Sequence, residues 1–177
     1  MGKRSAEGIV QVCHVVEDLD DAIARWIENF GAGPFFVQRN LRVPIVYRGS
    51  PSHIDIDVAL GQSGELQVEL IKIASMIPSV YRDVFPNGGG GFHHVAMFVP
   101  DFQDRLAAYE REGCPIGATG EFNGSGFAYV DTRSKVGFFT ELYEEGEGMR
   151  KFYANIAGAA IGWSGESPVR PFEDVLP

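Results

Sequence analysis

The sequence has little of several features that mark common classes of protein. Its 177 residues include only 2 cysteines, Cys13 and Cys114, which are far apart, so neither a disulfide scaffold nor a cysteine-rich zinc site is indicated. No apolar run approaches the roughly 20 residues that span a bilayer. Residues 1–8 also lack the apolar stretch of a secretory signal. We therefore expect a cytoplasmic protein that does not enter a membrane.

A basic surface is lacking as well. The formal net charge is −9, from 24 acidic and 15 basic side chains. Nucleic-acid binders carry a basic face, so nucleic acid is not an expected partner. The glycine run at 88–91 is not followed by the Gly-Lys-Ser/Thr ending of a phosphate-binding loop. At 45% hydrophobic and 22% charged residues, the composition is that of an ordinary globular protein.

What the chain does contain is an internal repeat. Residues 9–31 and 92–113 each begin with an apolar strand that ends in Val-x-Asp-Leu/Phe and continue into an amphipathic helix that ends at a glycine. Asp18 and Asp101 follow the two strands at the positions where helix N-caps are expected. The spacing of apolar residues behind each aspartate is helical. A repeat of this length predicts two copies of one folding unit.

Three strand-like runs follow each helix, so each half is predicted to be a β-α-β-β-β module in an α+β fold. The runs lie at approximately 34–48, 53–60 and 65–73 in the first half, and 115–122, 126–131 and 137–144 in the second. The expected organisation is a first module at 8–73, a linker with a short helix and a flexible glycine run at 74–91, a second module at 92–145, and a helix with an extended surface tail at 146–177.

Four polar residues occupy two pairs of repeat-related strand positions. Gln11 and His94 each lie seven residues before the aspartate that follows their strand, and Glu69 and Glu141 align in the closing strands LQVELIKI and FFTELYEE. Burying such groups without partners would cost several kcal/mol each, so a shared cation is the simplest partner. One imidazole with oxygen ligands suits Zn, Ni, Co, Mn or Fe. The pattern predicts one divalent-metal site made by these four residues.

Side chains on a strand alternate between its two faces, which places further residues near this site. Gln67 shares the face of Glu69 and is expected to support the metal ligands or to contact substrate. Phe98 and Phe139 are candidates for an apolar substrate pocket, although core packing is the default for aromatic residues. Asp55 lies in the alternating stretch HIDID at 53–57. Its face either points into the site, where Asp55 would contact substrate, or forms a solvent-facing edge.

Three other residues near the four ligand positions are given lesser roles. His14 and His93 are each an odd number of residues from Gln11 or His94, so both are expected to face the helix layer unless a bulge reverses the alternation. Cys13 shares the face of Gln11, where a small buried hydrophobic role is expected.

The paired modules, with ligand candidates on the first and last strand of each, resemble the vicinal oxygen chelate superfamily. That superfamily includes glyoxalase I, methylmalonyl-CoA epimerase, extradiol dioxygenases and fosfomycin and bleomycin resistance proteins. The resemblance covers roughly residues 8–145. The segments GFHHVA at 91–96 and VPDF at 99–102 are most similar to the epimerase and glyoxalase-like branch. The resemblance implies that the modules curl side by side into an open, barrel-like cup with the metal inside.

The resemblance implies a lyase or isomerase, epimerase-like, that acts on a small, partly apolar, oxygen-bearing substrate. The metal would stabilise a developing enolate or oxyanion, with Glu141 as the first candidate for the base and Glu69 as the second. Glyoxalase I itself matches less well, because its glutathione-binding basic residues have no clear counterpart in this sequence. Arg39, Arg42 and Arg48 either bind an anionic group or form a solvated face.

Two alternatives within the same fold stay open. One is an iron-dependent dioxygenase, although family dioxygenases typically use two histidines and one glutamate, and Gln11 stands where the first histidine is expected. The other is a non-catalytic protein that binds a drug or metabolite. Homodimers are common in the superfamily, so a homodimer is a further expectation, but the sequence marks no interface.

Overall fold

The two repeated segments fold as the predicted β-α-β-β-β modules. The computed structural model describes residues 8–177. The first module contains β1 (Gln11–Val15), α1 (Leu19–Phe30), β2 (Phe35–Tyr47), β3 (Ser50–Ser63) and β4 (Leu66–Ile73). The second contains β5 (Gly91–Val99), α3 (Phe102–Arg111), β6 (Ile116–Phe122), β7 (Ser125–Val130), a short α4 (Arg133–Val136) and β8 (Phe139–Glu144). Around them lie α2 (Val80–Val84), α5 (Glu147–Ala160), β9 (Val169–Pro171) and the 3-10 helix η1 (Phe172–Val175).

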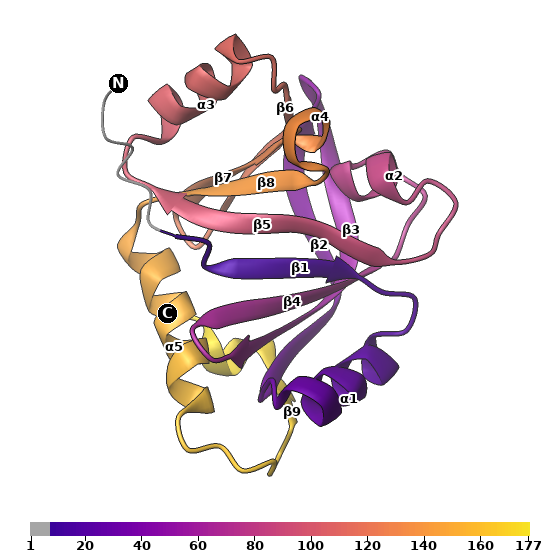
Figure 1. The fold of residues 1–177 in the computed structure, drawn as a ribbon, viewed down its shortest axis with the longest axis vertical. Helices are drawn as coiled ribbons and strands as arrows, with labels where there is room; N and C mark the ends of the chain where they lie inside the picture. The colour runs from indigo at the N-terminus through magenta and orange to yellow at the C-terminus, as the bar shows by residue number, and fades with distance from the viewer. Residues whose placement is uncertain (1–7) are drawn as a thin grey trace.

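The strands form one nine-stranded mixed sheet in the order β3-β4-β1-β5-β8-β7-β6-β2-β9. Within each module the first strand pairs in parallel with the last, and the modules join through the antiparallel pair β1–β5 at the centre of the molecule (Figure 1). β2 pairs with β3 and also, over three residue pairs, with β6. The barrel-like α+β fold is therefore confirmed, and the short β2–β6 seam closes the circuit of strands.

Helices α1 and α3 lie on the outside of the sheet, on opposite sides of the β1–β5 pair (Figure 1). The Asp18 carboxylate accepts a hydrogen bond from the backbone N–H of Asp21 at 3.0 Å, as expected of an N-cap. Gly31 ends α1 in the left-handed conformation at φ 61°. Asp101 is likewise the N-cap residue of α3, as predicted, but its side chain makes no capping hydrogen bond.

The inward-facing side chains form one large core inside the barrel, and two smaller clusters lie beneath α1 and α3. Strand alternation explains the division. On β3, for example, Ile54, Ile56 and Val58 belong to the inner core, whereas Ala59 belongs to the cluster under α1. The inner face therefore carries the cavity described below, while the outer face is the attachment surface for helices.

One residue of the exposed glycine run between the modules lies close against β1. A Cβ atom at Gly90 would collide with the backbone oxygen of Val15, so only glycine allows the chain to pass the end of β1 this closely. The predicted helix at 79–85 is present as α2, whose N-cap Ser79 accepts from the backbone N–H of Arg82.

The C-terminal region contributes to the barrel interior. The predicted helix is present as α5, which contacts β3 and β4 (Figure 1). The tail was expected to extend over the surface, and most of residues 161–171 is exposed. However, β9 pairs in parallel with β2, and η1 buries Phe172 and Val175 to 5% and 2% exposure. These two apolar side chains anchor the tail because they complete the inner core.

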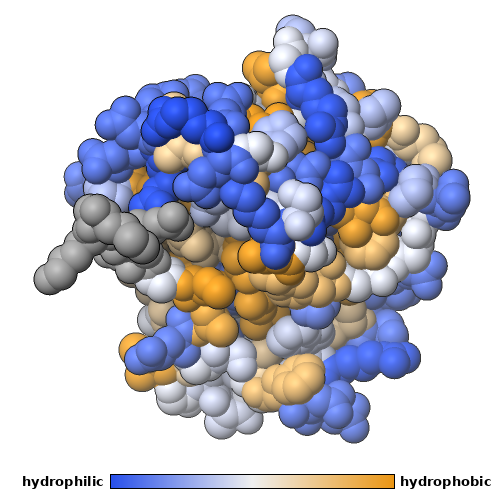
Figure 2. Space-filling model, turned by 45° about the horizontal axis from the view of Figure 1, so that its top comes forward, coloured by the Kyte–Doolittle hydropathy of each residue, from blue (hydrophilic) through white to orange (hydrophobic). Residues whose placement is uncertain are grey.

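Part of the outer face is left apolar. Figure 2 shows apolar side chains gathered across the middle of a largely polar surface. Separately, a chain of aromatic contacts links Phe30 and Trp26 of α1 through His14 to Phe92 and Phe138. Among residues 8–177, no helix combines the length and the apolar character needed to cross a bilayer.

Candidate metal centre

Four adjacent strands at the junction of the modules bring the predicted ligand positions together. Gln11 lies on β1, Glu69 on β4, His94 on β5 and Glu141 on β8. Cys13 of β1 is the register partner of both Glu69 and His94, which places these two residues on either side of one strand. Three of the four side chains are almost fully buried: Gln11 at 1%, His94 at 0% and Glu141 at 3% exposure.

One imidazole nitrogen faces two carboxylates. His94 Nε2 lies 3.0 Å from Glu141 Oε2 and 3.4 Å from Glu69 Oε2. Ligand atoms held about 2.0–2.2 Å from one ion lie roughly 3.0–3.5 Å apart, so these distances suit a shared divalent cation. The contacts lack hydrogen-bond alignment: both His94 Nε2 and Glu69 Oε2 are buried without a hydrogen-bond partner in the described part of the chain. A cation between them would satisfy both atoms.

The electrostatics of the three groups also favour a cation. Burial lowers the pKa of His94, but the Glu141 and Glu69 carboxylates outweigh burial and raise that pKa to about 9. Burial raises the pKa of Glu141, and the charge and hydrogen bond of His94 lower it again in part. The two carboxylates thus hold a positive charge at His94 when no metal is bound, and a metal ion would replace that proton.

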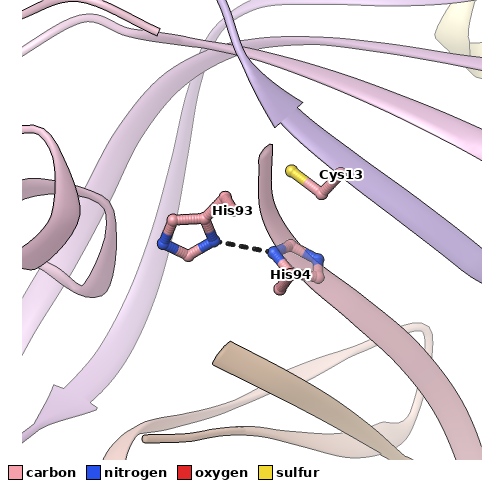
Figure 3. Close-up of side chains that lie close together, drawn as sticks. All are labelled: Cys13, His93 and His94. Carbon is pink, nitrogen blue, oxygen red and sulfur yellow. Dashed lines mark hydrogen bonds between the residues drawn. The ribbon is translucent and has the colours of Figure 1, made fainter. Parts of the chain in front are cut away.

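A β-bulge turns a second histidine inward. Cys13 pairs with His94, whereas His14 pairs with Phe92, so His93 is the extra residue in β5. His93 therefore does not face the helix layer: the bulge that was the stated exception to the alternation rule is present in β5. Figure 3 shows His93 and His94 pointing toward each other, with Cys13 beside them. His14 does face the helix layer, with its ring centroid 5.3 Å from that of Trp26.

The hydrogen bonds of His93 determine which nitrogen of His94 is free. His93 Nε2 lies 3.1 Å from the Val80 carbonyl oxygen, which can only accept, so Nε2 carries a hydrogen. Burial lowers the pKa of His93 well below 6.5, so the ring is neutral and its Nδ1 is an acceptor. His94 Nδ1, 2.8 Å away, must then donate to it. This assignment follows from the hydrogen-bond network and leaves His94 Nε2 to face the carboxylates.

A second group of potential ligands, Cys13, His93 and His94, also has ligand atoms within 4.8 Å of one another (Figure 3). Burial and the nearby Glu69 raise the pKa of the Cys13 thiol, which disfavours the thiolate form that metals bind. The Nδ1 lone pair of His93 is already used by His94. Glu69, His94 and Glu141 are therefore the better ligand set.

Gln11 and Gln67 lie beside the carboxylates and are linked to them through a tyrosine. Gln11 Nε2 donates to Gln67 Oε1 at 2.6 Å, and the Tyr143 hydroxyl lies 3.4 Å from Gln11 Oε1. The same hydroxyl donates to Glu141 Oε2 at 2.9 Å. The structure thus places Gln11 next to the three-residue group, with its amide oxygen directed toward Tyr143.

The sequence reasoning missed the tyrosines around the carboxylates. Tyr143 lies two residues after Glu141 and therefore shares its face, a signal that strand alternation offers. Tyr129 is the register partner of Glu141, and its hydroxyl lies 3.0 Å from that of Tyr81. Their pKa values, like that of Tyr143, are raised well above 10.0 by burial and by the nearby carboxylates, so they act as hydroxyl donors.

The carboxylates and amides line one end of an apolar cavity of about 80 Å³. The cavity wall consists of Gln11, Leu41, Val43, Ile54, Ile56, Val58, Leu60, Gln67, Glu69, Tyr81, Phe122, Phe127, Tyr129, Glu141, Tyr143, Met149, Phe152, Tyr153 and Phe172. Gln67, a predicted ligand support or substrate contact, is in the wall. Phe98 and Phe139 are not: Phe98 packs against Tyr143 and Tyr153, and Phe139 stacks on His93 at 5.3 Å.

Asp55, a predicted substrate contact, is not in the cavity wall. Its neighbours Ile54 and Ile56 point inward, which directs Asp55 to the outside of β3. There its carboxylate lies 3.2 Å from His53 and 3.6 Å from Arg42. Asp55 therefore lies on the polar outer face of an alternating strand, which is the other possibility that the sequence allowed.

Comparisons with known proteins agree with this architecture. The model of the glyoxalase/bleomycin resistance protein/dioxygenase superfamily matches residues 10–129. Methylmalonyl-CoA epimerase from Mycobacterium tuberculosis is 18% identical, with 85% of this chain and 95% of that chain covered and a TM-score of 0.59. A hypothetical protein from Bacillus halodurans C-125 is also 18% identical, with 81% and 97% covered and a TM-score of 0.58. A methylmalonyl-CoA epimerase in complex with methylmalonyl-CoA is 17% identical, with the same coverage and TM-score. No curated protein sequence matches the chain significantly.

Proposed function

The chain belongs to the glyoxalase/bleomycin resistance protein/dioxygenase superfamily, and on that premise we propose that it is a divalent-metal-dependent lyase or isomerase with epimerase-like chemistry. The observation that carries the proposal is the convergence of Glu69, His94 and Glu141 at one end of an apolar cavity, with two of their ligand atoms buried and unpartnered. Without a metal, His94 Nε2 faces both carboxylates as an ion pair, and a divalent cation bound between the three groups would replace the proton of His94.

Glu69, His94 and Glu141 would hold the metal, with Gln11 as the fourth candidate ligand beside them. The donor set of one imidazole and oxygen atoms suits Zn, Ni, Co, Mn or Fe. When bound, the ion supplies Lewis-acid stabilisation of an enolate or oxyanion that develops on the substrate. His93 holds the His94 ring with Nε2 facing the two carboxylates, because His94 Nδ1 donates to it.

The proton transfer is assigned to a carboxylate of the same group. Glu141 is the first candidate for the base, since its side chain reaches the cavity and Tyr143 holds Oε2 in position at 2.9 Å. Glu69 is the second candidate and also lines the cavity. The buried tyrosines keep this end of the cavity supplied with hydroxyl donors, because burial and the carboxylates raise their pKa values.

The substrate is proposed to be small and oxygen-bearing, because the polar groups of the cavity are confined to one end and the remaining wall is apolar. The donor set supports proton transfer over iron-dependent dioxygenation. The oxygenase triad usually has two histidines and one carboxylate, whereas only His94 directs a nitrogen toward the carboxylates here.

Deuterium exchange tests the proposal directly. The protein is reconstituted separately with Zn, Ni, Co, Mn and Fe and incubated with hydroxyacetone, an enolisable hydroxyketone, in heavy water. Proton NMR then follows loss of the carbon-bound hydrogens next to the carbonyl. We expect the protein to speed hydrogen–deuterium exchange above the rate with the same metal ion alone, and we expect no oxygen consumption. Oxygen uptake with iron would support the dioxygenase instead, and metal binding without exchange of any enolisable ketone would support a binding protein.

A further inference from the structure

The cavity has a wall that lies outside the segment matched by the family model, which ends at residue 129. Met149, Phe152 and Tyr153 of α5 and Phe172 of η1 line it. Met149, Phe152 and Phe172 are buried to 3%, 2% and 5% exposure. The C-terminal segment thus decides much of the shape of the cavity.

This wall is anchored in the barrel by aromatic packing. Phe152 lies 5.4 Å, between ring centroids, from both Phe122 of β6 and Phe172 of η1. Tyr153 lies 5.7 Å from Tyr143, the residue that donates to Glu141. The packing ties α5 to the candidate metal centre and gives the cavity an aromatic side suited to a flat apolar group.

The wall carries no positive charge. Glu69 and Glu141 are the only charged residues of the wall within the described part of the chain. One divalent ion would neutralise the two carboxylates, and nothing would remain to balance an anionic substrate. Burying an additional unpaired carboxylate or phosphate in such a place is strongly unfavourable.

The arginines that the sequence offered as anion-binding candidates already have acidic partners outside the cavity. Arg39 lies 2.6 Å from Asp20, Arg42 lies 3.6 Å from Asp55, and Arg48 lies 2.6 Å from Asp83. None of the three lines the cavity. They therefore offer no ready site for the phosphates of coenzyme A or the carboxylates of glutathione.

We infer that the cavity takes an uncharged, compact substrate whose apolar, ring-bearing body packs against Phe122, Phe152 and Phe172 while its oxygen atoms face Glu69, His94 and Glu141. It disfavours substrates that would place a carboxylate or phosphate inside this cavity. The inference rests on the proposed function for the role of the metal, but the apolar and charge preferences belong to the wall itself. Phe152 and Phe172 are then specificity-determining residues.

A matched set of probes tests this by isothermal titration calorimetry, with protein loaded with Co and with metal-free protein. The probes are 2-hydroxyacetophenone, hydroxyacetone, the 4-carboxylate of 2-hydroxyacetophenone, and methylmalonyl-CoA. 2-Hydroxyacetophenone carries an apolar ring where hydroxyacetone carries a methyl group. Its 4-carboxylate differs from it only by the negatively charged group. We expect the ring to strengthen binding by about tenfold or more, and the carboxylate to weaken it by at least about tenfold.

Two test variants and one control variant locate the effect. Phe152→Ala should reduce the preference for the ring to below about threefold, whereas Ile161→Ala, which alters an 84% exposed side chain on the same segment, should leave it unchanged. Phe172→Leu is a milder second variant, checked for folding by circular dichroism, and should also reduce the preference. Tighter binding of methylmalonyl-CoA or of the carboxylated ketone would overturn the inference.

Failure of the inference and failure of the proposed function give different results. If the protein binds no metal but metal-free protein still prefers the uncharged ring, the enzyme proposal fails and the description of the cavity stands. If metal binds and ketone exchange occurs but the anionic probes bind best, the proposed function stands and this inference is wrong.

Discussion

The two modules share one fold but contribute unequally to the candidate metal centre. The first supplies Gln11 and Glu69 from regular strands, and Gln11 is engaged with Gln67 and Tyr143. The second supplies His94 and Glu141, and its bulge adds His93 as a hydrogen-bonding partner for His94. The repeat therefore sets which positions converge, while a local irregularity in one copy sets how the central ligand is held.

If the second module carries the main chemistry, Glu141→Gln should have the largest effect on turnover. We expect exchange to fall about 100- to 10,000-fold, because an amide of the same shape cannot accept the proton. Glu69→Gln is the matched variant of the first module and should have the smaller effect. Exchange is measured by proton NMR in heavy water at saturating metal. A larger loss in Glu69→Gln would reverse the assignment of the base.

His93→Phe should weaken metal binding by roughly 10- to 100-fold, because His94 Nδ1 loses its acceptor and the ring is no longer held with Nε2 toward the carboxylates. Phenylalanine keeps the packing against Tyr81 and Phe139. The affinity is measured by calorimetry, and nitrogen NMR of the metal-free protein reports the hydrogen position on His94. His14→Phe, on the outer face, is the control. Unchanged affinity in His93→Phe would remove His93 from the account.

Gln11→Leu should have a smaller effect, lowering metal affinity by no more than about tenfold, because Gln11 is at most one of four ligands and its amide oxygen already faces Tyr143. The same titration measures it, with Gln67→Leu as the matched change on the neighbouring strand. A loss as large as that in a His94 variant would show that the first module contributes equally.

The junction between the modules can be tested through stability. Gly90→Ala should lower the free energy of unfolding by about 1–3 kcal/mol, because the new methyl group collides with the Val15 carbonyl and forces the two strands apart. Gly158→Ala in α5 meets open space and should raise it by up to about 1 kcal/mol. Urea unfolding of both variants gives the difference. Equal stabilities would show that the junction adapts without strain.

The sequence predicted the positions of the site better than its supporting contacts. Strand alternation and the repeat together placed Gln11, Glu69, His94 and Glu141 on one inner face, because both rules depend only on local geometry. The inward turn of His93 depends on a bulge, which arises from the pairing of β5 with β1 and leaves no mark in the spacing of residues.

Other features that the sequence left open have the same origin in tertiary structure. Asp55 lay on a face whose direction the alternation alone did not fix, and the outer one was correct. Phe172 and Val175 become core residues only because a barrel interior exists for them to fill. A tail rich in glycine and proline gives no periodic signal for that. The cavity wall therefore followed from the structure and not from the sequence.

The most direct test of the account is elemental analysis of protein that was purified without a histidine tag or chelator and then dialysed against each candidate metal. Wild-type protein and His14→Ala should hold close to one equivalent of one of these metals, and His94→Ala close to none. That result would establish that His94 and its two carboxylates form a metal centre. Absence of bound metal in the wild type, or full retention in His94→Ala, would contradict the central claim.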